Sequence, residues 1–247
     1  MSQALYAAIS GSSNQQMRLD VLTNNLANVN TVGFKEDKLY FHIPDSKEDP
    51  RMLNKVAGFV MAPPAQPYET RTDFSPSTLK HTSNVLDVAL NGEGFFCVQT
   101  PEGEKYTRRG DFSLTEEGKL INKDGYPVLG KNGEIVLQGG KITIGEKGEI
   151  SVDGIPADTL KVVGIKKPQM LQKASGTLFS LKEGAAGETE LKKTKVQQGF
   201  LENSGVNPVK TMTEMIDVLR GYESYQKIIH FLNDVSKKSI NEVGKLA

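Results

Sequence analysis

The two ends of this 247-residue chain share a hydrophobic spacing that differs from the spacing in its middle. Near both termini, apolar residues recur at alternating intervals of three and four, which is the period of one face of an α-helix. Between the termini, short apolar runs are separated by turn residues, which is typical of β-strands. This order predicts an α+β fold, with a helix at each end and an antiparallel β region of sandwich or barrel type between them.

The N-terminal stripe predicts a helix over about residues 2–30. Six of its eight positions are apolar, and together they form a narrow stripe of the coiled-coil type: Leu5, Ala8, Ser12, Gln15, Leu19, Leu22, Leu26 and Val29. Gly33 follows the stripe and suits a left-handed C-terminal cap. An amphipathic helix that packs on its own domain is the alternative interpretation.

The C-terminal stripe predicts a longer helix, over residues 208–246. Asn207 offers an N-cap before Pro208 at the first helical position, and Thr211 with Glu214 offers a competing capping box. Eight of the ten stripe positions are apolar or aromatic: Met215, Val218, Tyr222, Tyr225, Ile229, Leu232, Ser236, Ser239, Val243 and Leu246. A helix of this length is on the order of 55 Å long.

The chain between the helices divides into two parts. Six of the eleven prolines lie between Pro44 and Pro76, so residues 36–80 are expected to be an extended connector with at most short strands. Residues 81–204 are expected to be the β-rich domain, because turn signals recur in it every 8–12 residues, as Asp124-Gly125 and Asp153-Gly154 illustrate. Residues 1–35 and 205–247 then form a discontinuous helical domain.

The composition excludes several classes of function. Thirty basic and thirty acidic side chains cancel, which gives no sign of a nucleic-acid or anionic-membrane partner. Nothing at the N-terminus reads as a signal peptide, and no stretch approaches the length of a membrane span. Cys97 is the only cysteine, so an intrachain disulfide and a multi-cysteine zinc site are both excluded, and a small core residue is expected there.

No motif of catalysis or cofactor binding is found. Gly92 and Gly94 lack the third glycine of a dinucleotide loop, and His42, His81 and His230 lie in three different regions. We therefore expect no enzyme, cofactor, metal site or small-molecule substrate. A surface-binding or hydrolase β module with coiled-coil ends is the rival class, and it would need a pocket with convergent polar groups.

The two striped helices at opposite ends of the chain predict assembly. Pairing them with each other buries one seam and leaves much of each stripe uncovered, which is unstable in isolation. Other copies of the chain would supply the missing surface, and heterologous contacts that do not close into a ring generate a filament.

Several runs resemble the flagellar basal-body rod and hook proteins. Residues 19–35 read LDVLTNNLANVNTVGFK, which is similar to the N-terminal signature ANNLANxNTxG[FY]K of that family, with Thr23 where Ala is usual. The middle is similar through LDVALNGEGFF at residues 86–96 and YTRRGDF at 106–112. Near the C-terminus, LENS at 201–204 and RGYE at 220–223 resemble the partner signature.

The resemblance implies a hook-protein-like β domain and a structural role in the axial tube that transmits torque and carries exported subunits. The terminal helices would build the inner tube and the β domain its outer wall. A proximal rod subunit is expected, with a distal rod subunit or a secreted β-rich binding module as alternatives. The chain would leave the cell unfolded, without a cleaved signal, through the flagellar type III export apparatus, and assemble in the periplasm with its own copies and neighbouring rod proteins.

The expected assembly interface joins the two stripes to the polar end of the first helix. The asparagines there are expected to lock axial register between neighbouring helices, as a buried Asn does in coiled coils, the alternative being solvated residues at a helix end. The interface residues are Leu5, Leu19, Leu22, Asn24, Asn25, Leu26, Asn28, Val29, Asn30, Gly33, Phe34, Met215, Val218, Tyr222, Tyr225, Ile229, Leu232, Val243 and Leu246.

Overall fold

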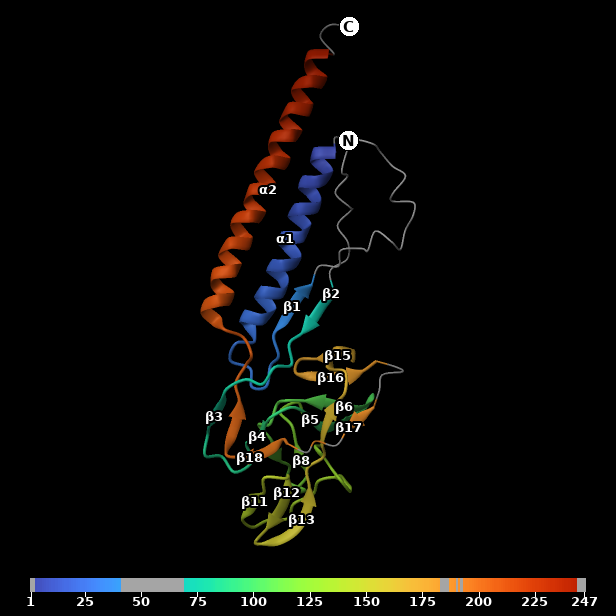
Figure 1. Cartoon of the computed structure of the whole chain (residues 1–247), viewed down its shortest axis with the longest axis vertical. Helices are drawn as coiled ribbons and strands as arrows, with labels where there is room; N and C mark the ends of the chain where they lie inside the picture. The colour runs from blue at the N-terminus through green and yellow to red at the C-terminus, as the bar shows by residue number, and fades with distance from the viewer. Residues whose placement is uncertain (1–2, 41–68, 183–186, 190, 192, 244–247) are drawn as a thin grey trace. The chain divides into compact units, whose positions relative to one another are not determined.

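The computed structural model describes residues 3–40, 69–182, 187–189, 191 and 193–243, with side chains in the last helix up to residue 238 (Figure 1). By its internal contacts the chain forms two units. The helical unit takes in Met1–Ala27, Asp37–Arg71 and Asn207–Ala247, and the β unit takes in Asn28–Glu36 and Thr72–Val206. Residues 28–35, assigned to the helices from the sequence, thus make their contacts with the β unit.

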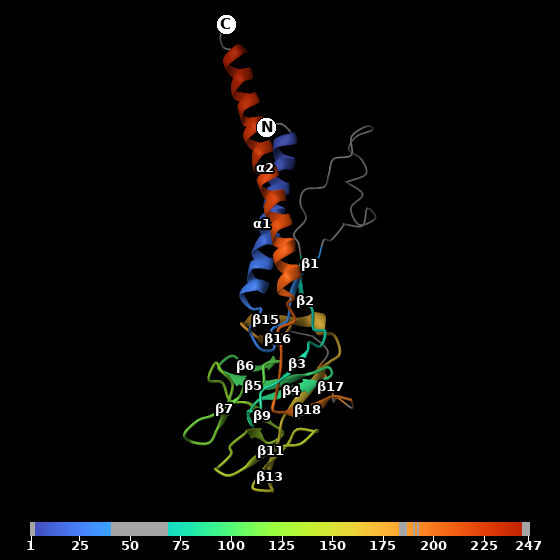
Figure 2. The ribbon, with the colours of Figure 1, turned by 90° about the vertical axis from the view of Figure 1, so that its left-hand side faces the viewer.

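The helical unit contains the two long helices, α1 (Gln3–Ala27) and α2 (Pro208–Val243). They lie side by side and antiparallel, as Figures 1 and 2 both show. The side chain of Asn207 accepts a hydrogen bond from the Lys210 amide at 3.1 Å, so Asn207 is the N-cap and Pro208 the first helical residue, as predicted. Thr211 and Glu214 lie inside the helix and cap nothing.

The first helix ends earlier than its stripe predicts. It stops at Ala27, and a turn follows in which the Thr31 amide donates to the Asn28 carbonyl at 3.1 Å. Gly33 has a left-handed φ of 66°, but it lies six residues beyond the helix, so the prediction that it caps α1 is wrong. Its conformation serves a close approach instead, because a Cβ there would overlap the backbone of Arg108.

Short strands flank the proline-rich segment. β1 (Asp37–Tyr40) pairs with β2 (Glu69–Thr72), and β3 (Leu79–His81) pairs with β19 (Phe200–Glu202). Residues 41–68, which hold most of the expected connector, lie outside the described residues.

The largest sheet of the β unit has six antiparallel strands in the order β15-β16-β6-β5-β14-β17. Their bounds are β15 (Leu171–Ser175), β16 (Leu178–Leu181), β6 (Gly103–Thr107), β5 (Phe95–Thr100), β14 (Val162–Ile165) and β17 (Glu188–Thr189). The short 3₁₀ helix Pro168–Met170 precedes β15.

The central strand β5 is buried on both faces. Phe95 and Cys97 belong to one cluster of buried residues, whereas Phe96 and Val98 belong to a second, larger one. Because successive side chains of a strand point to opposite faces, this alternation explains why the strand is a continuous apolar run.

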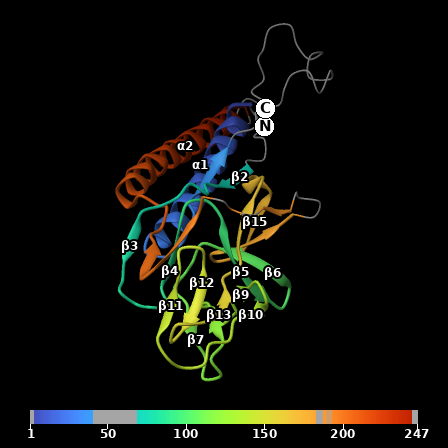
Figure 3. The same ribbon diagram turned by 60° about the horizontal axis from the view of Figure 1, so that its bottom comes forward.

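Smaller antiparallel pairs complete the β unit (Figure 3). They comprise β4 (Val88–Asn91) with β18 (Lys195–Gln198), β7 (Ser113–Leu114) with β8 (Leu120–Ile121), β9 (Leu129–Gly130) with β10 (Gly133–Glu134), and the three-stranded sheet β11 (Ile142–Ile144), β12 (Glu149–Val152) and β13 (Ile155–Thr159). The turn between β12 and β13 has left-handed φ values at Asp153 and Gly154, of 52° and 82°. These values match the hairpin predicted from that dipeptide.

The order of helix, antiparallel β region and helix is therefore confirmed. Among the described residues, no helix is both long enough and apolar enough to cross a membrane.

Candidate assembly interface

The seam between α1 and α2 is built around small residues. A Cβ on Gly11 would overlap the ring of Tyr225, and a Cβ on Gly221 would touch the side chain of Gln15. Next to them, the Gln226 amide donates to the Ser12 hydroxyl at 3.0 Å. The glycines thus allow the two helices to approach closely, at the cost of about 1 kcal/mol each in helix propensity.

The predicted stripes face this seam. On α2, Val218 is buried, and Met215, Tyr222, Tyr225, Ile229 and Leu232 are half-buried. On α1, Ala8 and Ser12 are buried, and Leu5, Leu19, Leu22 and Leu26 are half-buried. The stripes therefore contact each other within one chain, and their half-exposed edges remain available to a further helix.

A second set of apolar residues on the helices is exposed. On α2 these are Val209, Met212, Ile216, Leu219, Ile228, Phe231 and Val235, with Val209 at 73% and Phe231 at 66% exposure. On α1, Tyr6, Ile9 and Met17 are exposed. These residues lie outside the two stripes on which the predicted interface was based. The signal was present as a second run of three-and-four spacing, from Val209 to Leu219.

The four predicted asparagines occupy different environments. Asn25 is buried, and its amide donates to the Asp37 carbonyl at 2.8 Å while accepting from the Asp37 amide at 3.0 Å. It thus fastens the end of α1 to the start of β1 within the chain. Asn28 accepts from the Thr31 hydroxyl at 3.1 Å, whereas Asn24 and Asn30 are exposed.

Gly33 and Phe34 are buried in the β unit. The Gly33 amide donates to the Glu202 carbonyl at 2.8 Å, and the Phe34 carbonyl accepts from the Gly205 amide at 2.9 Å. The ammonium group of Lys173 lies 4.1 Å from the centre of the Phe34 ring. Val29 is half-buried in the same unit. Of the remaining predicted residues, Val243 is at the end of α2 and its side chain is not described, and Leu246 lies outside the described residues.

A fully buried ionic cluster lies where the chain enters and leaves the β unit. The Lys35 ammonium donates to Glu202 Oε1 at 2.7 Å and to the Ser75 carbonyl at 2.6 Å. Arg108 donates to Glu202 Oε2 at 3.4 Å and to the Gly92 carbonyl at 2.7 Å, and the Ser77 amide also donates to Glu202. One carboxylate therefore joins segments that are distant in the sequence.

The two basic residues of this cluster have shifted pKa values. Burial lowers the pKa of Lys35 and of Arg108 below their ordinary values, and the Glu202 carboxylate opposes both shifts. Among the described residues, Nε of Arg108 has no hydrogen-bond partner. All three residues lie in runs that resemble the rod and hook proteins, yet periodicity alone gives no reason to bring them together.

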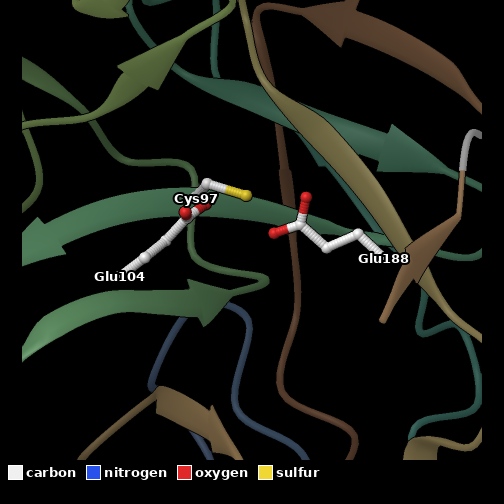
Figure 4. A group of neighbouring side chains, drawn as sticks. All are labelled: Cys97, Glu104 and Glu188. Atoms are coloured by element: carbon white, nitrogen blue, oxygen red, sulfur yellow. The ribbon is translucent and has the colours of Figure 1, made fainter. Parts of the chain in front are cut away.

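A third group, Cys97, Glu104 and Glu188, has the composition of a metal site (Figure 4). Its ligand atoms lie within 4.8 Å of one another, on β5, β6 and β17. The ammonium of Lys161, however, already donates to Glu104 at 2.7 Å and to Glu188 at 3.2 Å. Burial and the neighbouring Glu104 raise the pKa of the Cys97 thiol far above its usual value. The two carboxylates thus already share one lysine, and a thiol that stays protonated is a poor metal ligand.

A cavity of about 550 Å³ lies beside this group. It is lined by three lysines, Lys131, Lys147 and Lys161, by Glu188, by the threonines Thr189 and Thr194, and by apolar side chains; Lys161 and Glu188 are paired to each other. The described residues that line it include no serine, cysteine or histidine, so the cavity gives the rival hydrolase interpretation no support.

Three family models match the chain. One described as "Flagella basal body rod protein" matches residues 5–35, and one described as "Flagellar hook protein FlgE/F/G D1 domain" matches residues 89–152. A third, "Flagellar basal body rod FlgEFG protein C-terminal", matches residues 197–242. Each of the three matched segments contributes one residue to the buried cluster, namely Lys35, Arg108 and Glu202 in that order.

Curated relatives match over nearly the whole length. The flagellar basal-body rod protein FlgF of Caulobacter vibrioides is 30% identical over 250 residues, covering 100% of both chains. The rod protein FlgG of Bacillus subtilis is 32% identical over 263 residues, covering 98% of this chain and 99% of that one. FlgF of Rhizobium meliloti is 30% identical over 252 residues, with 99% of each chain covered. The chain therefore belongs to the flagellar basal-body rod protein family, and it is a structural subunit of the flagellar basal body, not an enzyme.

Proposed function

We propose that the chain is a subunit of the proximal rod, with FlgF as its counterpart. The alignments support this choice through their length. The alignment with Caulobacter FlgF spans 250 residues and takes in the whole chain, whereas those with the FlgG proteins of Bacillus and of one Buchnera strain span 263 and 266 residues and cover 98% and 96% of it. A chain of 247 residues needs few gaps in the first case and many in the others. FlgG, the distal rod protein, is the alternative.

The position in the rod can be tested by imaging. Basal bodies purified from the source bacterium would carry an epitope inserted at the exposed hairpin turn Asp153-Gly154, and a labelled antibody would be located by electron microscopy. Label at the membrane-proximal part of the rod is expected. Label at the hook-proximal part would assign the chain to the distal rod, without affecting its membership of the family.

We propose further that the terminal helices polymerise into the inner tube, in coiled-coil fashion, while the β unit forms its outer wall. The observation that carries this proposal is the exposed apolar set on α2. These residues remain exposed although the stripe of α2 packs against α1. Exposed apolar surface of this kind marks an interaction site. The half-exposed stripe residues, together with Asn24, Asn28 and Asn30, belong to the proposed interface, and copies of this chain and neighbouring rod proteins are its partners.

Export through the flagellar type III apparatus, without a cleaved signal, and assembly in the periplasm complete the proposal. A narrow channel requires an unfolded chain, and this sequence, with one cysteine, has no intrachain disulfide to prevent unfolding. In a strain that lacks the export ATPase, the full-length chain should accumulate inside the cell and be missing from basal-body preparations. Its appearance in the periplasm of that strain would reject this export route.

A further inference from the structure

The exposed apolar residues of α2 form two separate faces. When Met215, Tyr222 and Ile229 are placed at heptad position a, and Val218, Tyr225 and Leu232 at position d, the seam with α1 is the a/d stripe. Val209, Met212, Ile216 and Leu219 then occupy positions b and e, on one flank of that stripe. Ile228, Phe231 and Val235 occupy positions c and g, on the opposite flank.

Each face occupies only half of the helix. Along the b/e flank, within the part of α2 whose side chains are described, the apolar residues end at Leu219, and the helix continues with polar residues: Glu223, Gln226, His230, Asn233 and Lys237. Along the c/g flank the order is reversed, because the N-terminal half holds Lys210, Glu214, Asp217 and Ser224 before the apolar residues begin at Ile228. The b/e face is thus apolar near the start of α2, and the c/g face is apolar near its end.

Resting on the proposed function, we infer that α2 of one copy contacts α2 of the next through unlike faces, b/e against c/g, with the two copies displaced along the helix axis by about 26 Å. The displacement follows from the separation between the centres of the two apolar faces, which is about 17 residues at 1.5 Å per residue.

The physical argument for this stagger is desolvation. In a helical filament all copies point in the same direction, so the two helices are parallel and the contact is heterologous. Without a displacement, Met212 and Ile216 of one copy would face Lys210, Glu214 and Asp217 of the next, which would bury charges against apolar side chains. With the displacement, the apolar faces meet each other. His230 and Asn233 of one copy, and Lys210, Glu214 and Asp217 of the next, lie beyond the overlap of the two helices.

The occupant of each face is therefore a second copy of this chain. A contact of b/e with b/e, or of c/g with c/g, would require a two-fold axis perpendicular to the filament. Such an axis is absent when all copies point in the same direction. A single helix with one apolar face on each flank is suited to two neighbours, one on either side.

The stagger can be tested by disulfide cross-linking in assembled rods. Two alleles of the full chain would be co-expressed, one carrying Ile216→Cys and the other carrying Phe231→Cys or Val235→Cys, which bracket the inferred displacement. The matched control combines Ile216→Cys with Asp217→Cys, which would be level in copies without displacement. Basal bodies are then oxidised and analysed on non-reducing gels. Cys97 contributes no background, because its side chain is fully buried.

We expect a cross-linked dimer with the 216/231 or the 216/235 pair. We expect no dimer with the 216/217 pair. A dimer with the 216/217 pair, or no dimer with any pair in rods that contain the chain, would overturn the stagger while the proposed function stood. A chain that is missing from the basal bodies of the unmodified strain would instead overturn the proposed function. If a cysteine variant fails to enter rods, Met212→Cys with Ile228→Cys probes the same displacement at another level.

Discussion

At the scale of single residues, the β unit depends on a charge arrangement that is costly unless it is complete. Lys35 and Arg108 are buried against one carboxylate, Glu202, so the cluster holds two cations and one anion. Burial of a charge costs several kcal/mol, which is offset only when the group is paired and hydrogen-bonded. The cluster meets this condition because Ser75, Ser77 and Gly92 supply backbone partners.

Glu202→Gln should destabilise the β unit by about 3–5 kcal/mol, because it leaves two buried cations without their counter-charge. The free energy of unfolding in urea measures this effect. Glu214→Gln is the matched control, since Glu214 pairs with Lys210 on an exposed helix face at 3.7 Å, and its loss should cost less than about 0.5 kcal/mol. Equal effects from the two substitutions would show that the buried cluster contributes little.

The thiol of Cys97 should be unreactive while the chain is folded. The thiolate is the nucleophile, and both complete burial and a strongly raised pKa keep the group protonated and inaccessible at neutral pH. A disulfide reagent is expected to label Cys97 only in urea, at the rate of global unfolding. Stoichiometric labelling of the native chain would contradict the described packing of β5.

Asn25→Ala should weaken the isolated chain as well as any assembly. It removes two hydrogen bonds to the backbone of Asp37, and the loss of a buried polar group's partners costs about 1–3 kcal/mol. Amide exchange at Asp37 should become faster. Asn30→Ala, at an exposed position, is the control and should leave that exchange unchanged. If Asn25→Ala blocks rod assembly and leaves exchange at Asp37 unchanged, the register role predicted from the sequence is favoured over the intrachain one.

At the scale of elements, the sequence predicted what depends on local pattern. The helices follow from three-and-four spacing, the start of α2 from the Asn207–Pro208 pair, and the hairpins from turn residues such as Asp153-Gly154. It could not predict the role of Gly33, whose conformation is required by the backbone of Arg108, which is distant in the sequence. The sequence identified the stripe of α2 that faces α1, but the predicted interface left out the exposed apolar rows beside it, which have the same period. In the structure the rows differ in burial, because Val218 of the stripe is buried whereas Met212 and Ile216 are exposed.

Two substitutions on α2 distinguish the role of the stripe that faces α1 from the role of the exposed apolar residues. Ile229→Asp places a charge in the half-buried seam with α1, so it should destabilise the helix pair within the monomer, by up to roughly the 1.5–3 kcal/mol that a buried side chain contributes. Phe231→Asp changes a side chain that is 66% exposed, so the thermal transition and helix content of the monomer should be retained while rod assembly is lost. Circular dichroism of the purified chain and motility of the strain measure the two effects. Should Ile229→Asp leave the monomer unaffected, the a/d stripe would serve contacts between subunits, as the sequence alone suggested.

At the scale of the whole molecule, the two units differ in what stabilises them. The β unit has two clusters of buried apolar side chains and the ionic cluster, whereas the helical unit has one seam between two helices. Isolated helices gain most of their stability from tertiary packing, so one seam is a weak basis for a stable unit. We expect the helices to depend on assembly for most of their protection, and the β unit to be stable alone.

Limited proteolysis tests this difference. In the dilute monomer, trypsin should cut at Arg18 in α1 and at Arg220 in α2, both of which are exposed, while bonds next to the buried Lys35 and Arg108 resist. In assembled rods the cuts at Arg18 and Arg220 should disappear, because the neighbouring copies that cover the apolar faces of α2 also prevent the local opening that cleavage needs. Mass spectrometry of the fragments distinguishes the two states. Helices that resist trypsin in the monomer would mean that the α1–α2 seam suffices for stability, and the exposed faces would then serve assembly alone.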